Sequence, residues 1–139
     1  MNVYLVTLGK GIQGPSRMNG ALFLGERSIY FLCASLGVTG GYDFSRFGAV
    51  GAALEDYKKT GTPPALTEEA VLALIPTAEH SFVLPADKLE QLSRSFCAGS
   101  KIVYDGGKKL VVWNPGFAGA FRDNAKSWAA GNGVATAGL

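Results

Sequence analysis

Residues 100–131 read SKIVYDGGKKLVVWNPGFAGAFRDNAKSWAAG, and this stretch decides the fold that the sequence predicts. Its two strand-like runs, Ser100–Tyr104 and Lys109–Trp113, flank a glycine-containing turn, since glycine adopts a positive φ without steric cost. Asn114 and Pro115 then predict a helix start, because Asn accepts hydrogen bonds from free helical N–H groups and Pro suits the first turn. The stretch is therefore expected to form a β-hairpin followed by a helix.

The expected helix carries one apolar face. Its apolar residues recur at spacings of four, four and three: Phe117, Phe121, Ala125 and Trp128. An apolar helix face must be buried, and a curved sheet is the natural cover. We therefore expect Phe117, Phe121 and Trp128 to form a structural plug for a bent sheet.

Apolar runs upstream of this unit predict further strands. They are Val3–Leu8, Ala21–Leu24, Ile29–Cys33 and Glu79–Leu84. The short connection between the second and third runs makes them an antiparallel hairpin. Residues 89–96 fit a strand or one helical turn, because their alternation decides for neither.

The segment 43–76 interrupts these strands with helical patterns. A helix is expected over Ser45–Lys59, with Gly61 as its end signal. A second, short helix is expected after Thr67, which is a good N-cap, and Pro76 ends it.

The composition indicates one folded domain. The 139 residues are 47% apolar and 17% charged, a profile typical of a folded chain rather than a disordered one. This length suits a single domain, 1–139, whose glycine-rich end, residues 132–139, is expected to be a flexible tail. The net charge of +2 is too small to imply a nucleic-acid partner, and none is expected.

Several features predict a cytoplasmic protein. No run reaches the roughly 18–20 apolar residues that a membrane span needs. The first residues lack the basic leader and the small-residue cleavage site of a signal peptide. Cys33 and Cys97 each lie in an apolar run, where two reduced core thiols are expected, with a disulfide or redox pair as the alternative.

The sequence contains no recognisable catalytic or metal-binding constellation. His80 stands alone before a strand, and its neighbours Glu79 and Ser81 would point to alternate sides of an extended chain. Two distant cysteines and one histidine give no metal-ligand spacing. We therefore expect no catalytic residue, no metal and no cofactor, and the balance of features is against an enzyme.

A glycine-rich loop precedes the first expected helix. Gly37, Gly40 and Gly41 follow an apolar strand, and a loop of this kind presents N–H groups that favour an anion. The spacing matches neither of the common phosphate-binding loops. An ordinary connector is the favoured interpretation. A small nucleotide- or phosphate-binding protein or enzyme that uses Gly37–Ser45 is the alternative.

Two further segments carry a resemblance to a known family. Gly20–Phe31 reads as an apolar strand, a turn with arginine and a second apolar strand, and Phe82–Leu89 as an apolar strand followed by Pro-x-Asp and an apolar residue. With the closing hairpin and helix, the chain resembles pleckstrin-homology and GRAM-like domains of the bacterial type. The resemblance implies an α+β fold, a bent antiparallel sheet or partly open barrel closed by a C-terminal helix, with 43–76 as a helical insertion.

The same resemblance bears on ligands. Lipid-binding members of the family carry a lysine after the first strand, followed by a basic residue and an arginine. Here Lys10 and Arg17 flank that loop, but Asn19 stands at the next alternate position. Specific inositide recognition is therefore not expected, whereas weak membrane-surface binding through Lys10 and Arg17 stays open. Gly40 and Gly41 are the other candidate ligand residues.

These observations favour a non-enzymatic binding or scaffold module. The resemblance implies that members without the full basic set bind proteins or have no known ligand. We expect an unidentified protein partner or a contact within a homo-oligomer. The insertion 43–76 is expected to carry the interface, and its deletion is expected to leave the sheet folded.

Overall fold

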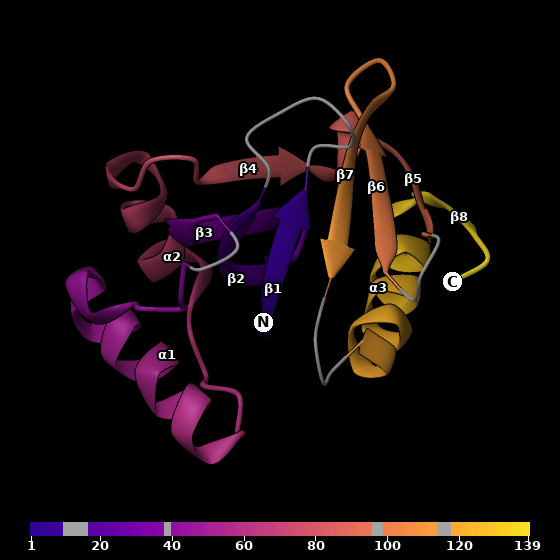
Figure 1. Ribbon diagram of the computed structural model, residues 1–139. Coiled ribbons are helices and arrows are strands. Elements are labelled where there is room, and N and C mark those ends of the chain that lie inside the picture. The colour runs from indigo at the N-terminus through magenta and orange to yellow at the C-terminus, as the bar shows by residue number, and fades with distance from the viewer. Residues whose placement is uncertain (10–16, 38–39, 96–98, 114–117) are drawn as a thin grey trace.

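The computed structural model of the chain describes residues 1–9, 17–37, 40–95, 99–113 and 118–139. These residues form one sheet of eight strands and three α-helices, with a helix near the C-terminal end (Figure 1). The α+β class expected from the sequence is confirmed. No helix within these ranges is long and apolar enough to cross a membrane.

The sheet has the strand order β4-β3-β2-β1-β7-β6-β5-β8. Its strands are β1 (Asn2–Gly9), β2 (Met18–Leu24), β3 (Ser28–Leu36), β4 (Phe82–Pro85), β5 (Leu89–Arg94), β6 (Ser100–Tyr104), β7 (Lys108–Trp113) and β8 (Ala135–Ala137). All neighbouring strands are antiparallel except β5 and β8, which are parallel. Figure 1 shows β3 and β4 lying across the direction of β6 and β7, so the sheet is strongly twisted.

The end of the chain differs from the expected flexible tail and from a purely antiparallel sheet. Residues 135–137 form β8, which pairs in parallel with Gln91–Ser93 of β5. Gly133 turns the chain with a φ of 69°, and the next residue, Val134, is buried. A strand that returns after a helix can run parallel to its neighbour, and the sheet is therefore mixed at this edge.

One face of the sheet, which we call the inner face, packs on α3 (Ala118–Asn132). Phe121 is 3% exposed, and its ring meets that of Tyr4 edge-to-face with centroids 5.1 Å apart. The indole N–H of the partly buried Trp128 donates to the Gly25 carbonyl at 2.6 Å. Phe117, the third residue of the expected plug, lies outside the described residues.

The opposite, outer face is covered over β3, β2 and β1 by α1 (Gly48–Thr60) and α2 (Glu68–Leu74). In Figure 1 these helices lie on the other side of the molecule from α3. Phe23 and Leu32 are 0% exposed in this second core, which also contains Leu54 and Val71 of the two helices. Deletion of 43–76 would expose this core, so the sheet should not fold without the insertion, contrary to the expectation from the sequence.

Local signals end or begin these helices. Gly61 closes α1 in the left-handed conformation with a φ of 71°, and its N–H donates to the Tyr57 carbonyl at 2.8 Å. Thr67 begins α2, its hydroxyl accepting the Ala70 N–H at 3.2 Å. The start of α1 lies later than expected, after a 3-10 turn at Ser45–Phe47. Further 3-10 turns follow α2 and β4, at Ile75–Thr77 and Ala86–Lys88.

Candidate functional site

A buried amide holds the glycine-rich loop against the sheet. Asn19, 4% exposed, donates through Nδ2 to the carbonyls of Gly37 at 2.9 Å and Gly40 at 3.0 Å. Its Oδ1 accepts the Thr7 hydroxyl at 2.9 Å, and Thr7 shares a further bond of 2.7 Å with the Tyr42 hydroxyl. Asn19, which stands at the position where a lipid-binding site would need a further basic residue, therefore has a structural role that the sequence did not reveal.

Carboxylates already occupy N–H donors that follow this loop. The Phe44 N–H donates to Glu55 Oε1 at 2.7 Å, and the Ser45 N–H donates to Asp43 Oδ1 at 2.9 Å. A bond from Lys58, 2.7 Å long, and the Phe44 N–H lower the pKa of Glu55, while bonds from the Ser45 side chain and backbone lower that of Asp43. A phosphate would have to displace the carboxylates of Glu55 and Asp43 from the backbone N–H groups that they occupy.

The candidate ligand residues have separate roles. Lys10 lies outside the described residues. Arg17 is exposed, and its guanidinium carbon lies 5.7 Å from the centroid of the Trp113 ring. Gly40 and Gly41 present their carbonyls to side chains of β2 and β3. The described part of the loop is thus held by bonds to β2 and β3 and by the Gly37 N–H, which donates to the Arg17 carbonyl at 2.9 Å, whereas the Arg17 guanidinium lies over Trp113.

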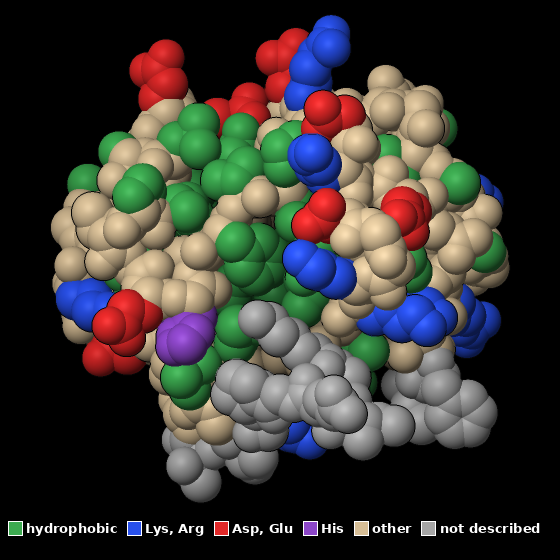
Figure 2. Space-filling view, turned by 90° about the horizontal axis from the view of Figure 1, so that it is seen from above, with side chains coloured by type: hydrophobic (Ala, Val, Ile, Leu, Met, Phe, Trp, Pro, Cys, Tyr) green, Lys and Arg blue, Asp and Glu red, His purple; other side chains and the backbone are tan. Residues whose placement is uncertain are grey.

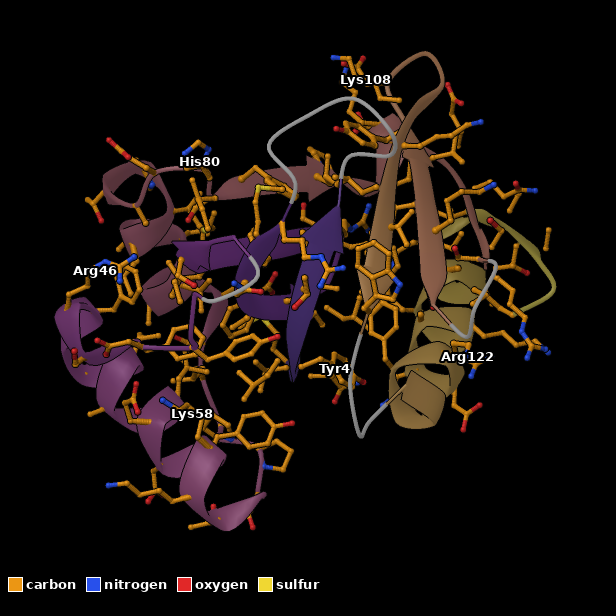
Figure 3. The ribbon with its side chains drawn as sticks, in the orientation of Figure 1. Tyr4, Arg46, Lys58, His80, Lys108 and Arg122 are labelled. Carbon is orange, nitrogen blue, oxygen red and sulfur yellow. The ribbon has the colours of Figure 1, made fainter. Side chains whose placement is uncertain are left out.

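The other groups considered for chemistry lie apart. His80 is exposed in the turn before β4, and Figure 3 shows it away from Lys108 on the tip of the β6–β7 hairpin. Cys33 is a buried free thiol whose pKa is raised by burial, whereas Cys97 lies outside the described residues. Within the described ranges, no three His, Cys, Asp or Glu side chains gather in a way that could hold a metal ion.

Hollows near β4 have polar or mixed rims. One of about 620 Å³ is lined by Glu26, Arg27, Ser28, Pro85, Ala86, Asp87, Gly131 and Asn132. Another, of about 330 Å³, is lined by Val83, Leu84, Pro85, Lys88, Tyr104 and Asp105. Figure 2 shows hydrophobic side chains in the middle of this side of the molecule, bordered by alternating basic and acidic groups. Such a rim favours neither an anion nor a cation.

The outer face of β7 and β6 is a more distinctive surface, because the described helices leave it uncovered. Leu110, Val112 and Ile102 belong to the inner core. Since side chains alternate across a strand, their neighbours on β7 and β6 point outward. These outward residues are Lys101, Val103, Lys109, Val111 and Trp113, of which Lys109 is exposed and the others partly exposed.

Three of these residues form an apolar diagonal, which we call the outer stripe: Val103, Val111 and Trp113. Lys101 pairs across the strands with Val111, and Lys109 pairs with Val103, so a cation flanks the stripe on each side. Arg17 adds a third cation at the Trp113 end. The alternation of lysine and valine along the hairpin was the sequence signal that could have identified this surface.

Comparisons with protein-family models, with curated proteins and with solved structures found no match to this chain.

Proposed function

We propose that this chain is a non-enzymatic binding module that recognises another protein through the outer stripe. The observation that carries the proposal is the unequal covering of the sheet. On β3, β2 and β1 the outer face is buried under α1 and α2, whereas on β7 and β6 it presents Val103, Val111 and Trp113 in partly exposed positions. A contiguous apolar surface with a charged border is typical of a protein interaction site.

The expected strength of such a contact is modest. Complete burial of a valine-sized or larger side chain is worth about 1.5–3 kcal/mol. Val103, Val111 and Trp113 are already partly buried, so closing them off would contribute roughly half of that amount each. This contribution suits a contact that forms and dissociates, because association itself costs several kcal/mol in lost freedom of motion.

The proposal places the interface on the sheet rather than on the insertion expected from the sequence. Most large apolar residues of 43–76 face the second core; Leu72 is an exception at 41% exposed. We also propose that the fold is of the pleckstrin-homology or GRAM-like type and that the protein acts in the cytoplasm. The order of strands, insertion and final helix supports the first of these, and the sequence features support the second.

Site-specific photocrosslinking in the host cell tests the proposal. A photoreactive amino acid in place of Lys109 should give a discrete adduct on illumination, because this side chain is exposed beside the stripe. The matched control places the same group at Lys59, which is exposed at the end of α1. An adduct of twice the chain mass would identify a homo-oligomer as the partner.

A second substitution separates specific contact from chance capture. Val111→Asp in the crosslinking variant should remove the adduct while leaving the far-ultraviolet circular dichroism unchanged, because the side chain points away from the inner core. Adducts of equal yield at positions 109 and 59, or an adduct that survives Val111→Asp, would contradict the proposal.

A further inference from the structure

We propose that the partner segment seated on the outer stripe is an amphipathic helix with acidic residues on both sides of its apolar face. This inference rests on the proposed function and specifies the chemistry of the partner. It follows from the charge of the border, from the width of the surface and from the way in which the neighbouring half of the sheet is covered.

The border of the stripe is positively charged. Lys101 and Lys109 lie on opposite sides of the apolar diagonal, and Arg17 lies at its Trp113 end. The ion pairs found among the described residues are Glu55–Lys58 and Asp105–Lys108, so neither involves these three cations. A partner that places carboxylates at both edges would complement them.

Nearby carboxylates of this chain are engaged in the hairpin turn. Asp105 pairs with Lys108 at 3.1 Å, and Glu90 Oε1 accepts the Gly106 N–H at 2.9 Å. Both groups lie toward the turn rather than at the Trp113 end of the stripe. The charge that a docking segment meets along the stripe is therefore that of the cations.

The width of the surface suits one helix. Neighbouring strands are about 4.8 Å apart, so β7 and β6, each taking up one such spacing, together present a face about 10 Å wide. An α-helix with its side chains is about 10–12 Å across. The fold already uses this solution, since α1 and α2 pack on the same face over β1, β2 and β3. A partner helix on β7 and β6 would continue that layer.

Single-stranded nucleic acid fits the surface less well. Such ligands need aromatic rings on which bases can stack, and the stripe offers one ring, that of Trp113. The Arg17 guanidinium already lies over this ring at 5.7 Å from its centroid. The lysines flank valines instead of further aromatic residues, so the surface favours carboxylates and an apolar helix face.

A designed peptide series tests the inference on the full chain. The probe is a fluorescein-labelled helical peptide of glutamate, leucine and alanine, with leucines spaced three and four apart and glutamates on both flanks. Its anisotropy should rise saturably with wild-type protein. Replacing the glutamates by glutamine should weaken binding at least tenfold, and raising the salt from low to high concentration should weaken it further.

Charge reversal on the protein supplies the decisive comparison. The double variant Lys101→Glu with Lys109→Glu should weaken the acidic peptide at least tenfold and should bind a lysine-flanked version of the same peptide instead. The control Lys59→Glu with Lys126→Glu changes the net charge equally at exposed positions on α1 and α3, and it should alter binding less than twofold.

Three results would overturn the inference: no saturable binding of the acidic peptide, an equal loss in both double variants, or tighter binding of a thymidine oligonucleotide. In each of these cases a Val111-dependent crosslink at position 109 would still support protein binding by the stripe, with a partner of different chemistry. Loss of that crosslink would overturn the proposed function itself.

Discussion

Replacing Asn19 with alanine should detach the glycine-rich loop from the sheet. Its amide nitrogen lies 2.9 Å from the Gly37 carbonyl and 3.0 Å from the Gly40 carbonyl, and its oxygen accepts from Thr7. The same nitrogen is 3.1 Å from the Ser35 hydroxyl. Alanine would remove all of these bonds at a position that is 4% exposed.

The expected loss of stability follows from the groups left behind. A hydrogen bond contributes about 0.5–1.5 kcal/mol net, and a buried polar group left without a partner costs about 1–3 kcal/mol. The Gly37 carbonyl keeps the Gly40 N–H at 3.3 Å and the Thr7 hydroxyl keeps its 2.7 Å bond to Tyr42, so the four lost bonds count at about 0.5–1 kcal/mol each rather than at the cost of unpartnered groups. The free energy of unfolding should therefore fall by about 3 kcal/mol, which corresponds to roughly 10 °C in Tm.

Urea unfolding followed by circular dichroism measures this change. Asn2→Ala is the matched control, because Asn2 is exposed on β1 and its loss should change stability by less than about 0.5 kcal/mol. Asn19→Asp should be at least as harmful as alanine at neutral pH, since a carboxylate would face two carbonyl oxygens. A loss below about 1 kcal/mol for Asn19→Ala, or a milder effect of aspartate, would refute the reasoning.

Three further predictions concern stability. Gly51→Ala should cost about 1–3 kcal/mol in urea unfolding, because the new Cβ would lie 2.0 Å from the Phe44 carbonyl oxygen. Gly131→Ala, in open space on α3, should instead gain up to about 1 kcal/mol. Equal effects of the two substitutions would contradict this prediction. Ser93→Ala should raise stability by about 1 kcal/mol in the same assay because, among the described residues, its hydroxyl is buried without a partner; a loss of stability would contradict this. Burial, with the bond to Glu68, raises the pKa of Tyr30 above 10.0. Stability should therefore fall as the pH rises above about 10, because the unfolded chain loses this proton first. Tyr30→Phe should reduce this dependence of stability on pH in thermal unfolding, and an unchanged dependence would contradict the prediction.

Local chemistry made much of the fold predictable. The hairpin strands at 100–104 and 108–113 follow from two apolar runs around a glycine turn. Gly61 and Thr67 mark helix ends because their effects act within one turn of the chain. The covering of both sheet faces was not predictable in the same way, since it depends on which distant strands become neighbours.

Irregular pairing of β5 explains why the sequence of residues 89–96 fitted both a strand and a helical turn. In β5 the register shifts between Leu89 and Gln91, so Leu89 and Leu92 both reach the inner core. Such a bulge breaks the period of two on which a strand assignment depends. The parallel pairing of β8 had no apolar pattern to reveal it, because all of its residues are exposed.

The candidate site was partly hidden for a related reason. The sequence identified Arg17 as a potential ligand residue but gave no indication that it lies over Trp113, which is far along the chain. From the sequence, Asn19 was notable only because it is not basic at a position where a lipid-binding site would need a cation. Its hydrogen bonds to two loop carbonyls depend on the folded loop. Residues that act through long-range contacts need the fold before their roles can be read.

The complete burial of β2 determines which unfolding event exposes its backbone amides to solvent. All residues of Met18–Leu24 are buried, with α1 and α2 on one side of the sheet and α3 on the other. Amide protons of β2 should therefore exchange with solvent only through global unfolding, whereas those near the exposed β6–β7 turn should exchange through small local fluctuations. Deuterium uptake at the two places would report two different free energies from a single sample.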